Sequence, residues 1–407
     1  MIRGLLSCEV KRHLLDDNAR LERRRRRLRH RRRRRIGLAV LAALLAPVLY
    51  SYVTTMTKPS SLPLSVRSIE WVRSNHGAWL VNTVEHYWYS WTAPAPGGPA
   101  LKKLPAVGVS VRRTRRPVQP AKRSYRPPRI APILHPPLAG EGVWQPTGQL
   151  VKSAPPVLVT TFRPDRVYPR VVAYVAWIDH TRTQLTLYPG RYEPPGASPR
   201  GPMEVPASQR YRLLATFNSG FTYGDGHGGF AVDGQTVKPL QDGIGTVVAY
   251  RDGRVDVITW HGGATLPPWL VLARQNLPLI VDGGRPNPTL TDSSAFWGYT
   301  LGNAVRVWRS AVGVDRHGNL IYAAADLQTA RSLAALLIHA GAVRAIELDI
   351  NPEWPSFNTY GSPGAGNPFK LVPNYQQAAT RYLVPDDRDF FAVYGRIAGL
   401  TGTVPFR

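Results

Sequence analysis

The chain has 407 residues, which is enough for one large core or two modest cores with additional segments. Its formal net charge is +26, and the excess lies in two places. Residues 1–35 contain fifteen Lys or Arg and four Asp or Glu, and residues 102–130 contain ten Lys or Arg and no acidic residue. Residues 131–407 are nearly neutral, with twenty-four basic and twenty acidic residues. This distribution argues against a nucleic-acid partner, because the globular part carries little net charge.

The chain contains one cysteine, Cys8, which precedes a long apolar segment. An intrachain disulfide is therefore excluded. The region after the apolar segment also lacks the residues for a thiolate zinc site or a cysteine nucleophile. A cysteine-free domain is compatible with an oxidising compartment.

The first predicted element is a membrane helix over residues 36–56, preceded by a basic cytoplasmic tail over residues 1–35. The helix has no charged residue in 21 positions, which corresponds to about 31 Å at a rise of about 1.5 Å per residue. A buried helix of a soluble domain and a cleaved signal peptide are the alternatives. The dense arginine block before the span favours a signal anchor. We therefore expect a single-pass protein of the cell membrane, with a cytoplasmic N-terminus and an extracytoplasmic C-terminal domain.

Two segments are predicted between the membrane and the main domain. Residues 63–92 form an aromatic, juxtamembrane helical segment interrupted at Gly77, which could lie in the membrane interface or pack on the domain. Residues 93–156 contain fourteen prolines and the second basic cluster, and are expected to form an extended linker. The basic segments could bind anionic lipid or wall polymer, or the second could be a simple spacer.

Residues 157–407 are predicted to form a domain of the α+β class. We expect a mixed, largely antiparallel sheet with one βαβ crossover, in which a helix over 329–339 leads into a strand over 345–350. Asp252-Gly253 and His317-Gly318 are expected to close hairpins. The other predicted strands are 157–162, 170–178, 183–188, 212–217, 246–250, 254–260, 278–282 and 319–325.

The candidate site residues lie at strand ends. Asn218 ends a strand and could present its amide to a ligand, with Gly220 permitting close backbone approach, although Asn218 could also be a simple turn former. Asp282 follows a buried strand, where a plain Asp-Gly turn is the alternative.

The strand over 345–350 ends in a run of acidic and amide residues. Alternation places Glu347, Asp349 and Asn351 on one side of that strand. Carboxylates that share a face repel one another unless a cation, a shared proton or a substrate is present, so this run is a candidate functional cluster. Arg309, at the start of a preceding strand, could pair structurally with Asp326 or bind phosphate.

Several motifs follow one another in a characteristic order. They are FNSGF (217–221), VDGG (281–284), RSAVGVDRHGNLIY (309–322), the helix LQTARSLAALLIHAGAV (327–343) and AIELDIN (345–351). This order resembles the phosphodiester glycosidase family, the family of the N-acetylglucosamine-1-phosphodiester alpha-N-acetylglucosaminidase domain. The chain departs from the family after Asp349. Where the family has Gly-Gly-Gly-Ser, this sequence has a stiffer run that includes Trp354.

The resemblance implies a hydrolase that cleaves a glycosidic bond in a sugar-phosphate diester. Together with the predicted anchor, this leads us to expect a membrane-anchored, extracytoplasmic enzyme that acts on a cell-envelope polymer, and the high Arg, Ala and Pro content suggests a bacterial protein. Asp349, Glu347 and Asp282 are the expected catalytic residues. Asn218, Arg309, Asn351 and Gly220 are expected to bind substrate. No cofactor is expected, although the acidic cluster could hold a divalent cation. The alternatives are a non-catalytic wall-polysaccharide binder and a metal-dependent phosphoesterase.

Overall fold

The computed structural model divides the chain into two units, Met1–Lys58 and Pro59–Arg407, which we describe separately. Side chains of the first unit are described at positions 24 and 26 and from 28 onward. The described residues are 2–60, 62–77, 79–81, 83–84, 87, 91, 96–107, 125–196, 201–224, 226, 228–290, 296–298, 306–373 and 377–396.

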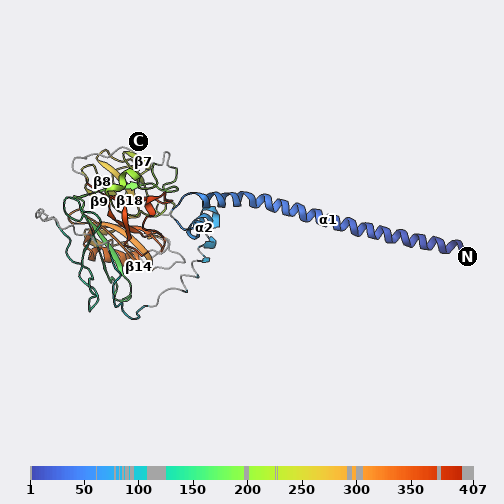
Figure 1. Ribbon diagram of the computed structural model, residues 1–407, viewed down its shortest axis with the longest axis horizontal. Coiled ribbons are helices and arrows are strands. Elements are labelled where there is room, and N and C mark those ends of the chain that lie inside the picture. The colour runs from blue at the N-terminus through green and yellow to red at the C-terminus, as the bar shows by residue number, and fades with distance from the viewer. Residues whose placement is uncertain are drawn as a thin grey trace. The chain divides into compact units, whose positions relative to one another are not determined.

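The first unit is a single helix, α1 (Ile2–Thr57), which Figure 1 shows as one continuous coil. Within it, Leu28–Thr57 is long and apolar enough to cross a membrane. Pro47 lies inside the helix without ending it. The predicted span 36–56 lies within this stretch, so the structure agrees with the sequence that one N-terminal apolar helix has membrane-spanning length.

The described part of the second unit contains three sheets, and its strand pairings between named strands are antiparallel. The large sheet has eight strands. In spatial order they are β1 (Gln145–Thr147), β2 (Val157–Phe162), β3 (Ala173–Ile178), β14 (Leu320–Gln328), β13 (Val307–Asp315), β15 (Ala342–Ile350), β11 (Leu279–Asp282) and β12 (Arg285–Pro286).

Two smaller sheets have five strands each. One has the order β7 (Gln235–Lys238), β6 (Phe230–Val232), β10 (Leu270–Gln275), β8 (Gly245–Tyr250) and β9 (Val255–Thr259). The other has the order β17 (Gly366–Lys370), β16 (Phe357–Ser362), β5 (Leu213–Asn218), β18 (Phe390–Gly395) and β4 (Thr183–Tyr188). Short 3-10 helices cover Ala207–Arg212 and Arg381–Leu383.

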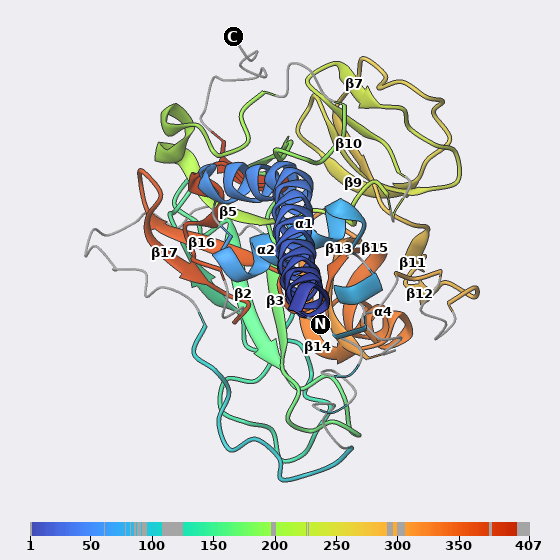
Figure 2. The ribbon, with the colours of Figure 1, turned by 90° about the vertical axis from the view of Figure 1, so that its right-hand side faces the viewer.

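The large sheet is buried on both faces. Along β3, Tyr174 and Ala176 face a core shared with the two smaller sheets, whereas Val175 and Trp177 face a core shared with the helix α4 (Ala330–His339). Successive strand side chains point to opposite faces, so one strand contributes to both cores. The domain is therefore layered as helix, large sheet and small sheets, and Figure 2 shows α4 beside β13 and β15.

The predicted crossover is confirmed. Thr329 caps α4, with its side chain accepting from the Ser332 backbone N–H while Ser332 returns a bond to the Thr329 N–H. Strands β14 and β15 flank the helix in sequence, and each pairs antiparallel with β13, which lies between them. The two strands therefore run in parallel directions, as the predicted βαβ unit requires.

The two predicted hairpins also form. Asp252-Gly253 joins β8 to β9, and His317-Gly318 joins β13 to β14. The strands β10, β16 and β18 are not among those predicted. β18, for example, is a short apolar run buried on both faces between β5 and β4, and such a run does not distinguish a strand from a buried helix segment.

The segment predicted as a linker, 93–156, differs from that expectation in its second half. Ile130 and Glu141 are buried, and β1 adds an edge strand to β2. Glu141 accepts three hydrogen bonds from the backbone and side chain of Arg163, which is itself buried. These contacts make residues 125–156 part of the domain despite their prolines. The basic cluster over 108–124 lies outside the described residues.

The juxtamembrane segment begins with α2 (Leu64–Val72) and a short π-helix (Arg73–Gly77). The helical backbone breaks at Asn75 and His76, next to the interruption predicted at Gly77. Val66 and Leu62 bury against Trp354 of the domain. Further along, the described aromatic side chains are exposed, namely Trp79, Tyr87 and Trp91. The segment thus packs on the domain at its start and leaves an apolar surface open beyond it.

Candidate functional site

A bulge in β15 separates the two carboxylates that the sequence placed together. Arg309 pairs with Ile350 and Ala311 pairs with Glu347, so β15 uses one residue more than β13 between these points. An extra residue breaks the alternation of side chains. Glu347 then meets Arg309, whereas Asp349 meets Arg388.

Arg309 and Glu347 form an ion pair that is buried in the domain. The Arg309 guanidinium also donates to the backbone carbonyls of Gln328 and Trp297, at 2.9 and 2.8 Å. Burial raises the pKa of Glu347, and the neighbouring Arg309 acts in the opposite direction. These contacts occupy Arg309 within the core, which favours a structural role over the predicted role in phosphate binding.

This interpretation predicts a large stability effect. Arg309→Met should lower the free energy of unfolding by about 3–5 kcal/mol, because it leaves the Glu347 carboxylate buried without its partner. The double variant Arg309→Met/Glu347→Leu should recover most of that loss, since both charges are removed. Urea unfolding of the three proteins measures this. A stable Arg309→Met protein that has lost substrate affinity would instead support phosphate binding.

Asn218 lies at the end of β5, and both the oxygen and the nitrogen of its side-chain amide are hydrogen-bonded within the protein. Its side-chain oxygen accepts from the hydroxyl of Tyr322 and from the backbone N–H of Ser356, both at 2.9 Å. Its amide donates to Ser310 Oγ at 3.0 Å, and that hydroxyl donates to the Asp349 carbonyl at 2.7 Å. Asn218 therefore positions the strand that carries Asp349, and its amide is not turned toward a ligand.

Gly220 makes room for a neighbouring side chain, and Asn351 shapes the backbone beside Asp349. A Cβ at Gly220 would come within 2.8 Å of the Asn276 side chain, so the glycine makes room for that amide. Asn276 in turn accepts from the Phe221 N–H and donates to the Glu347 carbonyl. Asn351 has a left-handed backbone with φ of 76°, which turns the chain away after β15.

Asp282 lies far from Asp349 along β15. β11 runs antiparallel to β15, with Val281 opposite Ala345, and the Gly284 N–H donates to the Val343 carbonyl. Asp282 is exposed at a hairpin beside the first residues of β15, whereas Asp349 is near its end. At about 3.3 Å per residue, the separation along the strand is about 16 Å. The structure does not bring Asp282 together with Asp349.

Arg388 has Glu193, Asp349 and Trp354 as neighbours, and these four residues are termed the Arg388 cluster. Arg388 Nη2 lies 3.5 Å from Asp349 Oδ2, and its guanidinium lies 4.2 Å from the centre of the Trp354 ring. Burial opposes the charge on Arg388, but Asp349 and the other nearby carboxylates outweigh it and raise the Arg388 pKa. The Trp354 ring thus covers the cation.

Glu193 joins the cluster through a tight loop. Gly190 brings the loop against the segment before β18, because a Cβ there would lie 2.4 Å from the Arg388 carbonyl carbon. The backbone N–H groups of Arg191 and Tyr192 donate to the carbonyls of Asp386 and Asp387. Burial raises the pKa of Glu193, and Arg388 partly offsets this. The cluster therefore pairs a carboxylate held against a cation, Asp349, with one that retains its proton more readily.

Several polar atoms at the cluster are buried and have no hydrogen-bond partner among the described residues. They are Ser219 Oγ, Asn351 Oδ1 and Arg388 Nη1. The Asp349 N–H donates to the Ser219 carbonyl, and Asn351 is two residues beyond Asp349, so all three atoms are close to Asp349 in the chain or in space. Buried polar groups are normally paired. Ser219 Oγ and Arg388 Nη1 can donate to the oxygens of a ligand, and Asn351 Oδ1 can accept from a ligand hydroxyl.

The start of the second unit forms part of the wall of the Arg388 cluster. Glu70 of α2 is among the carboxylates that raise the Arg388 pKa. Ser60 Oγ donates to Asp387 at 3.2 Å, and Arg191 pairs with the same carboxylate at 2.6 Å. Together with Val66 on Trp354, these contacts hold residues 60–70 against the cluster.

The acidic residues near the end of β15 are also a predicted candidate site for a divalent cation. Within the part of the chain that the structure describes, no three His, Cys, Asp or Glu side chains are placed to hold a metal ion. The carboxylates of Glu347 and Asp349 instead have arginine partners.

Glu193 and Arg388 are not among the site residues predicted from the sequence. Neither lies in a motif with a recognisable spacing, because Glu193 is in a proline-rich loop and Arg388 is in the acidic segment before β18. The close approach at Gly190 brings them together, and it depends on pairing between segments almost 200 residues apart. The one local trace of that contact in the sequence is Gly190, a position where any side chain would clash with the Arg388 backbone.

Residues 211–349 match the family model described as phosphodiester glycosidase. The match runs from just before β5 to Asp349, so it confirms the expected resemblance and supports a hydrolase. Glu193, Trp354 and Arg388 lie outside the matched residues. A search of curated proteins gave no significant match.

Solved structures show low similarity. The zebrafish N-acetylglucosamine-1-phosphodiester alpha-N-acetylglucosaminidase catalytic domain, auto-inhibited by its pro-peptide, is 18% identical over 62% of this chain and 88% of that chain, with a TM-score of 0.38. A hypothetical protein from Synechocystis is 13% identical over 62% of this chain and 64% of that chain, with a TM-score of 0.36.

Proposed function

We propose that this chain, whose residues 211–349 match the phosphodiester glycosidases, is a hydrolase that cleaves the glycosidic bond of a sugar-phosphate diester. The Arg388 cluster is its active site, and a phosphorylated polymer of the cell envelope is its substrate. The observation that carries this proposal is the arrangement of two unlike carboxylates, Asp349 and Glu193, around one guanidinium.

The residues have distinct roles in this proposal. Arg388 binds the phosphate of the diester, because a guanidinium matches the geometry of phosphate oxygens. Glu193, with its raised pKa, donates a proton to the departing phosphate oxygen as the bond from that oxygen to the sugar carbon breaks. Asp349, which pairs with Arg388, accepts a proton from the attacking water. The products are a free sugar and a phosphomonoester.

A non-catalytic polysaccharide binder is the second candidate, and Trp354 favours it. The indole is buried against Arg388 and α2, where the family has small residues. Such a side chain reduces the space beside Asp349, so the cluster could bind a glycan without hydrolysing it. The two candidates predict the same ligand chemistry and differ only in the release of product.

An assay of product release separates the candidates. The full chain, purified in detergent, is incubated with a panel of sugar-1-phosphate diesters, and free sugar and phosphomonoester are measured. Release of both in equal amounts supports the glycosidase. Binding without release supports the polysaccharide binder, and release of free sugar phosphate that a chelator abolishes would favour a metal-dependent phosphoesterase.

We propose that α1 anchors the domain on the outer side of the cell membrane. The apolar stretch Leu28–Thr57, the arginines before its core and the exposed Trp79, Tyr87 and Trp91 support this location. The chain would then span the membrane once, with residues 1–35 in the cytoplasm. A cleaved signal sequence is the alternative.

The single cysteine offers a direct test of this topology. A membrane-impermeant maleimide should leave Cys8 unlabelled in intact cells and label it after permeabilisation, because residues 1–35 are then cytoplasmic. A Cys8→Ser variant carrying Ser68→Cys, on α2, is the matched control and should be labelled in intact cells. Labelling of Cys8 from outside, or loss of the N-terminus from the mature protein, would contradict the anchor.

A further inference from the structure

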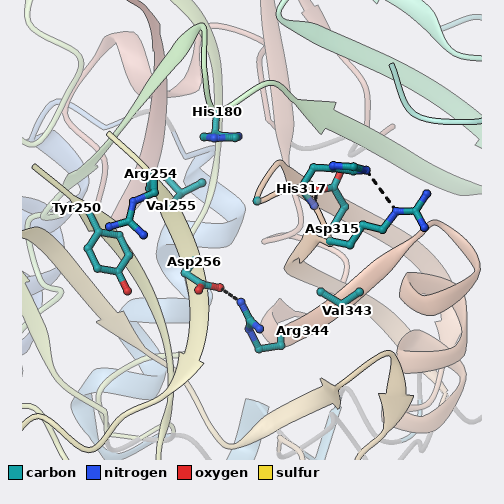
Figure 3. Close-up of a pocket in the computed structure, with 11 residues that line it drawn as sticks. His180, Tyr250, Arg254, Val255, Asp256, Asp315, His317, Val343 and Arg344 are labelled. Carbon is teal, nitrogen blue, oxygen red and sulfur yellow. Dashed lines mark hydrogen bonds and ion pairs between the residues drawn. The ribbon is translucent and has the colours of Figure 1, made fainter. Parts of the chain in front are cut away.

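A pocket of about 210 Å³ lies at the opposite end of β15 from Asp349 (Figure 3). It is formed where four chain segments meet. These are the turn after β3, the hairpin between β8 and β9, the hairpin between β13 and β14, and the first residues of β15. None of these residues belongs to the Arg388 cluster. At about 3.3 Å per residue, Arg344 and Asp349 are about 16 Å apart along the strand, so one small ligand cannot touch both.

The wall of this pocket is rich in cationic side chains. Arg254, Arg316 and Arg344 reach it from three different segments. Arg316 is exposed, and its Nε donates to the ring of His317 at 3.2 Å. Arg254 lies over the Tyr250 ring at 4.6 Å and pairs through Nε with the exposed carboxylate of Asp252 at 2.7 Å, and these contacts hold the guanidinium at the rim. Three guanidinium groups around one opening are an arrangement that binds phosphate oxygens.

The two carboxylates of the pocket are already engaged by the protein. Asp315 accepts from the His317 and Asn319 N–H groups at 2.8 and 2.9 Å, and from the indole of Trp177 at 3.0 Å. Asp256 is held by Arg344 and by the Val257 N–H. In Figure 3 the Asp256–Arg344 pair lies on one side of the opening, and His317 lies on another. Asp256 thus occupies part of Arg344, and Asp315 is neutralised mainly by N–H donors, so Arg254 and Arg316 are the guanidinium groups best placed for an added anion.

Two ring side chains also line the pocket. His180 and Tyr250 face the opening from separate segments (Figure 3). His180 Nδ1 lies 3.1 Å from Asn319 Oδ1, so Nδ1 carries the proton that it donates to that amide oxygen. The other ring nitrogen, Nε2, can then accept from a ligand hydroxyl. A sugar offers hydroxyl groups for such contacts and an apolar face for the Tyr250 ring.

We propose that this pocket binds a sugar phosphate, with Arg254 and Arg316 on the phosphate and His180 and Tyr250 on the sugar. This inference rests on the proposed function in one respect, because the ligand is then a second unit of the same phosphorylated polymer. The pocket holds that unit while the Arg388 cluster acts on another. It is a binding site and takes no part in the chemistry.

Calorimetric titration with α-glucose 1-phosphate tests the site directly. The full chain in detergent carries Arg388→Gln, so that binding at the Arg388 cluster is weakened. We expect glucose 1-phosphate to bind this protein, and the added pair Arg254→Gln/Arg316→Gln to weaken binding by at least about tenfold through the loss of charge-assisted hydrogen bonds. Glucose without phosphate should bind more weakly than glucose 1-phosphate.

The matched control is Arg166→Gln, in the loop between β2 and β3 and at the other end of β3 from His180. This exposed arginine carries the same charge, so its loss should leave affinity unchanged. Equal losses in both variants would show nonspecific attraction. That result would overturn the proposal. An unchanged affinity in the Arg254→Gln/Arg316→Gln protein, or no binding at all, would also overturn it.

A second measurement separates this site from the proposed function. In an otherwise unaltered chain, Arg254→Gln/Arg316→Gln should reduce turnover of a polymer substrate while leaving turnover of a short diester unchanged. A chain that turns over no diester would refute the proposed function, and the binding titration would still decide on the pocket. Equal effects on polymer and short diester would refute the role of the pocket as a second subsite.

Discussion

Asp349→Asn should lower turnover of a sugar-1-phosphate diester by roughly 10²–10⁴-fold, because the amide cannot accept a proton from water. The change keeps the size of the side chain and its contact with Arg388. The fold should therefore persist, and kcat should fall more than KM rises. Steady-state kinetics of the purified full chain, with thermal unfolding as a check on folding, measures the effect.

Asp282→Asn is the matched control for Asp349→Asn. Both residues lie at or near the end of a strand, and the sequence suggested both as catalytic residues. Asp282 is exposed on the hairpin between β11 and β12, away from the Arg388 cluster, so its loss should leave kcat within about twofold of the original. A large loss in Asp282→Asn together with an active Asp349→Asn protein would place the active site elsewhere.

Glu193→Gln is expected to be the second largest effect, again roughly 10²–10⁴-fold in kcat, because the amide has no proton to donate to the leaving group. The pH profile adds a specific expectation. Burial raises the Glu193 pKa, so the residue stays protonated above about pH 4.3, the ordinary value for glutamic acid. Activity of the unaltered chain should fall on the basic side as this proton is lost.

The same shift has a consequence for stability. The pKa of Glu193 is higher in the folded protein than in the unfolded chain, so the folded state binds the proton more tightly. Its contribution is fully present below the unfolded pKa and is lost as the pH rises through the folded pKa. The unfolding free energy of the unaltered chain should therefore fall relative to that of Glu193→Gln as the pH rises from acid to neutral. An unaltered chain that gains stability relative to Glu193→Gln over this range would contradict the assignment.

Much of the fold follows from local sequence patterns. Val157–Phe162 and Thr183–Tyr188 form strands with the predicted bounds, and the hairpins at Asp252-Gly253 and His317-Gly318 form because these residues suit tight turns. The helix at Ala330–His339 combines a capped N-terminus with an apolar face. Each of these features depends on neighbours within a few residues, which is why the sequence was sufficient.

The site was less predictable, because it depends on register and on distant contacts. Strict alternation placed Glu347 and Asp349 on one side of their strand, but the bulge in β15 gives each carboxylate a different arginine. The sequence contains no local indication of that extra residue. The partner of Asp349 is Arg388, which directly precedes β18. Its position next to Asp349 depends on the pairing of β18 with β5, which the sequence did not predict.

The sequence by itself determined the N-terminal apolar helix, the α+β class, the crossover around α4 and the resemblance to phosphodiester glycosidases. These depend on composition, on short-range periodicity and on motif order, which are properties of contiguous residues. Only the tertiary structure decided which charged groups meet. It assigned Arg309 to Glu347 in the core, separated Asp282 from Asp349, and brought Glu193, Trp354 and Arg388 into the candidate site. The physical reason is that ion pairing and burial depend on strand register and loop approach across the whole chain.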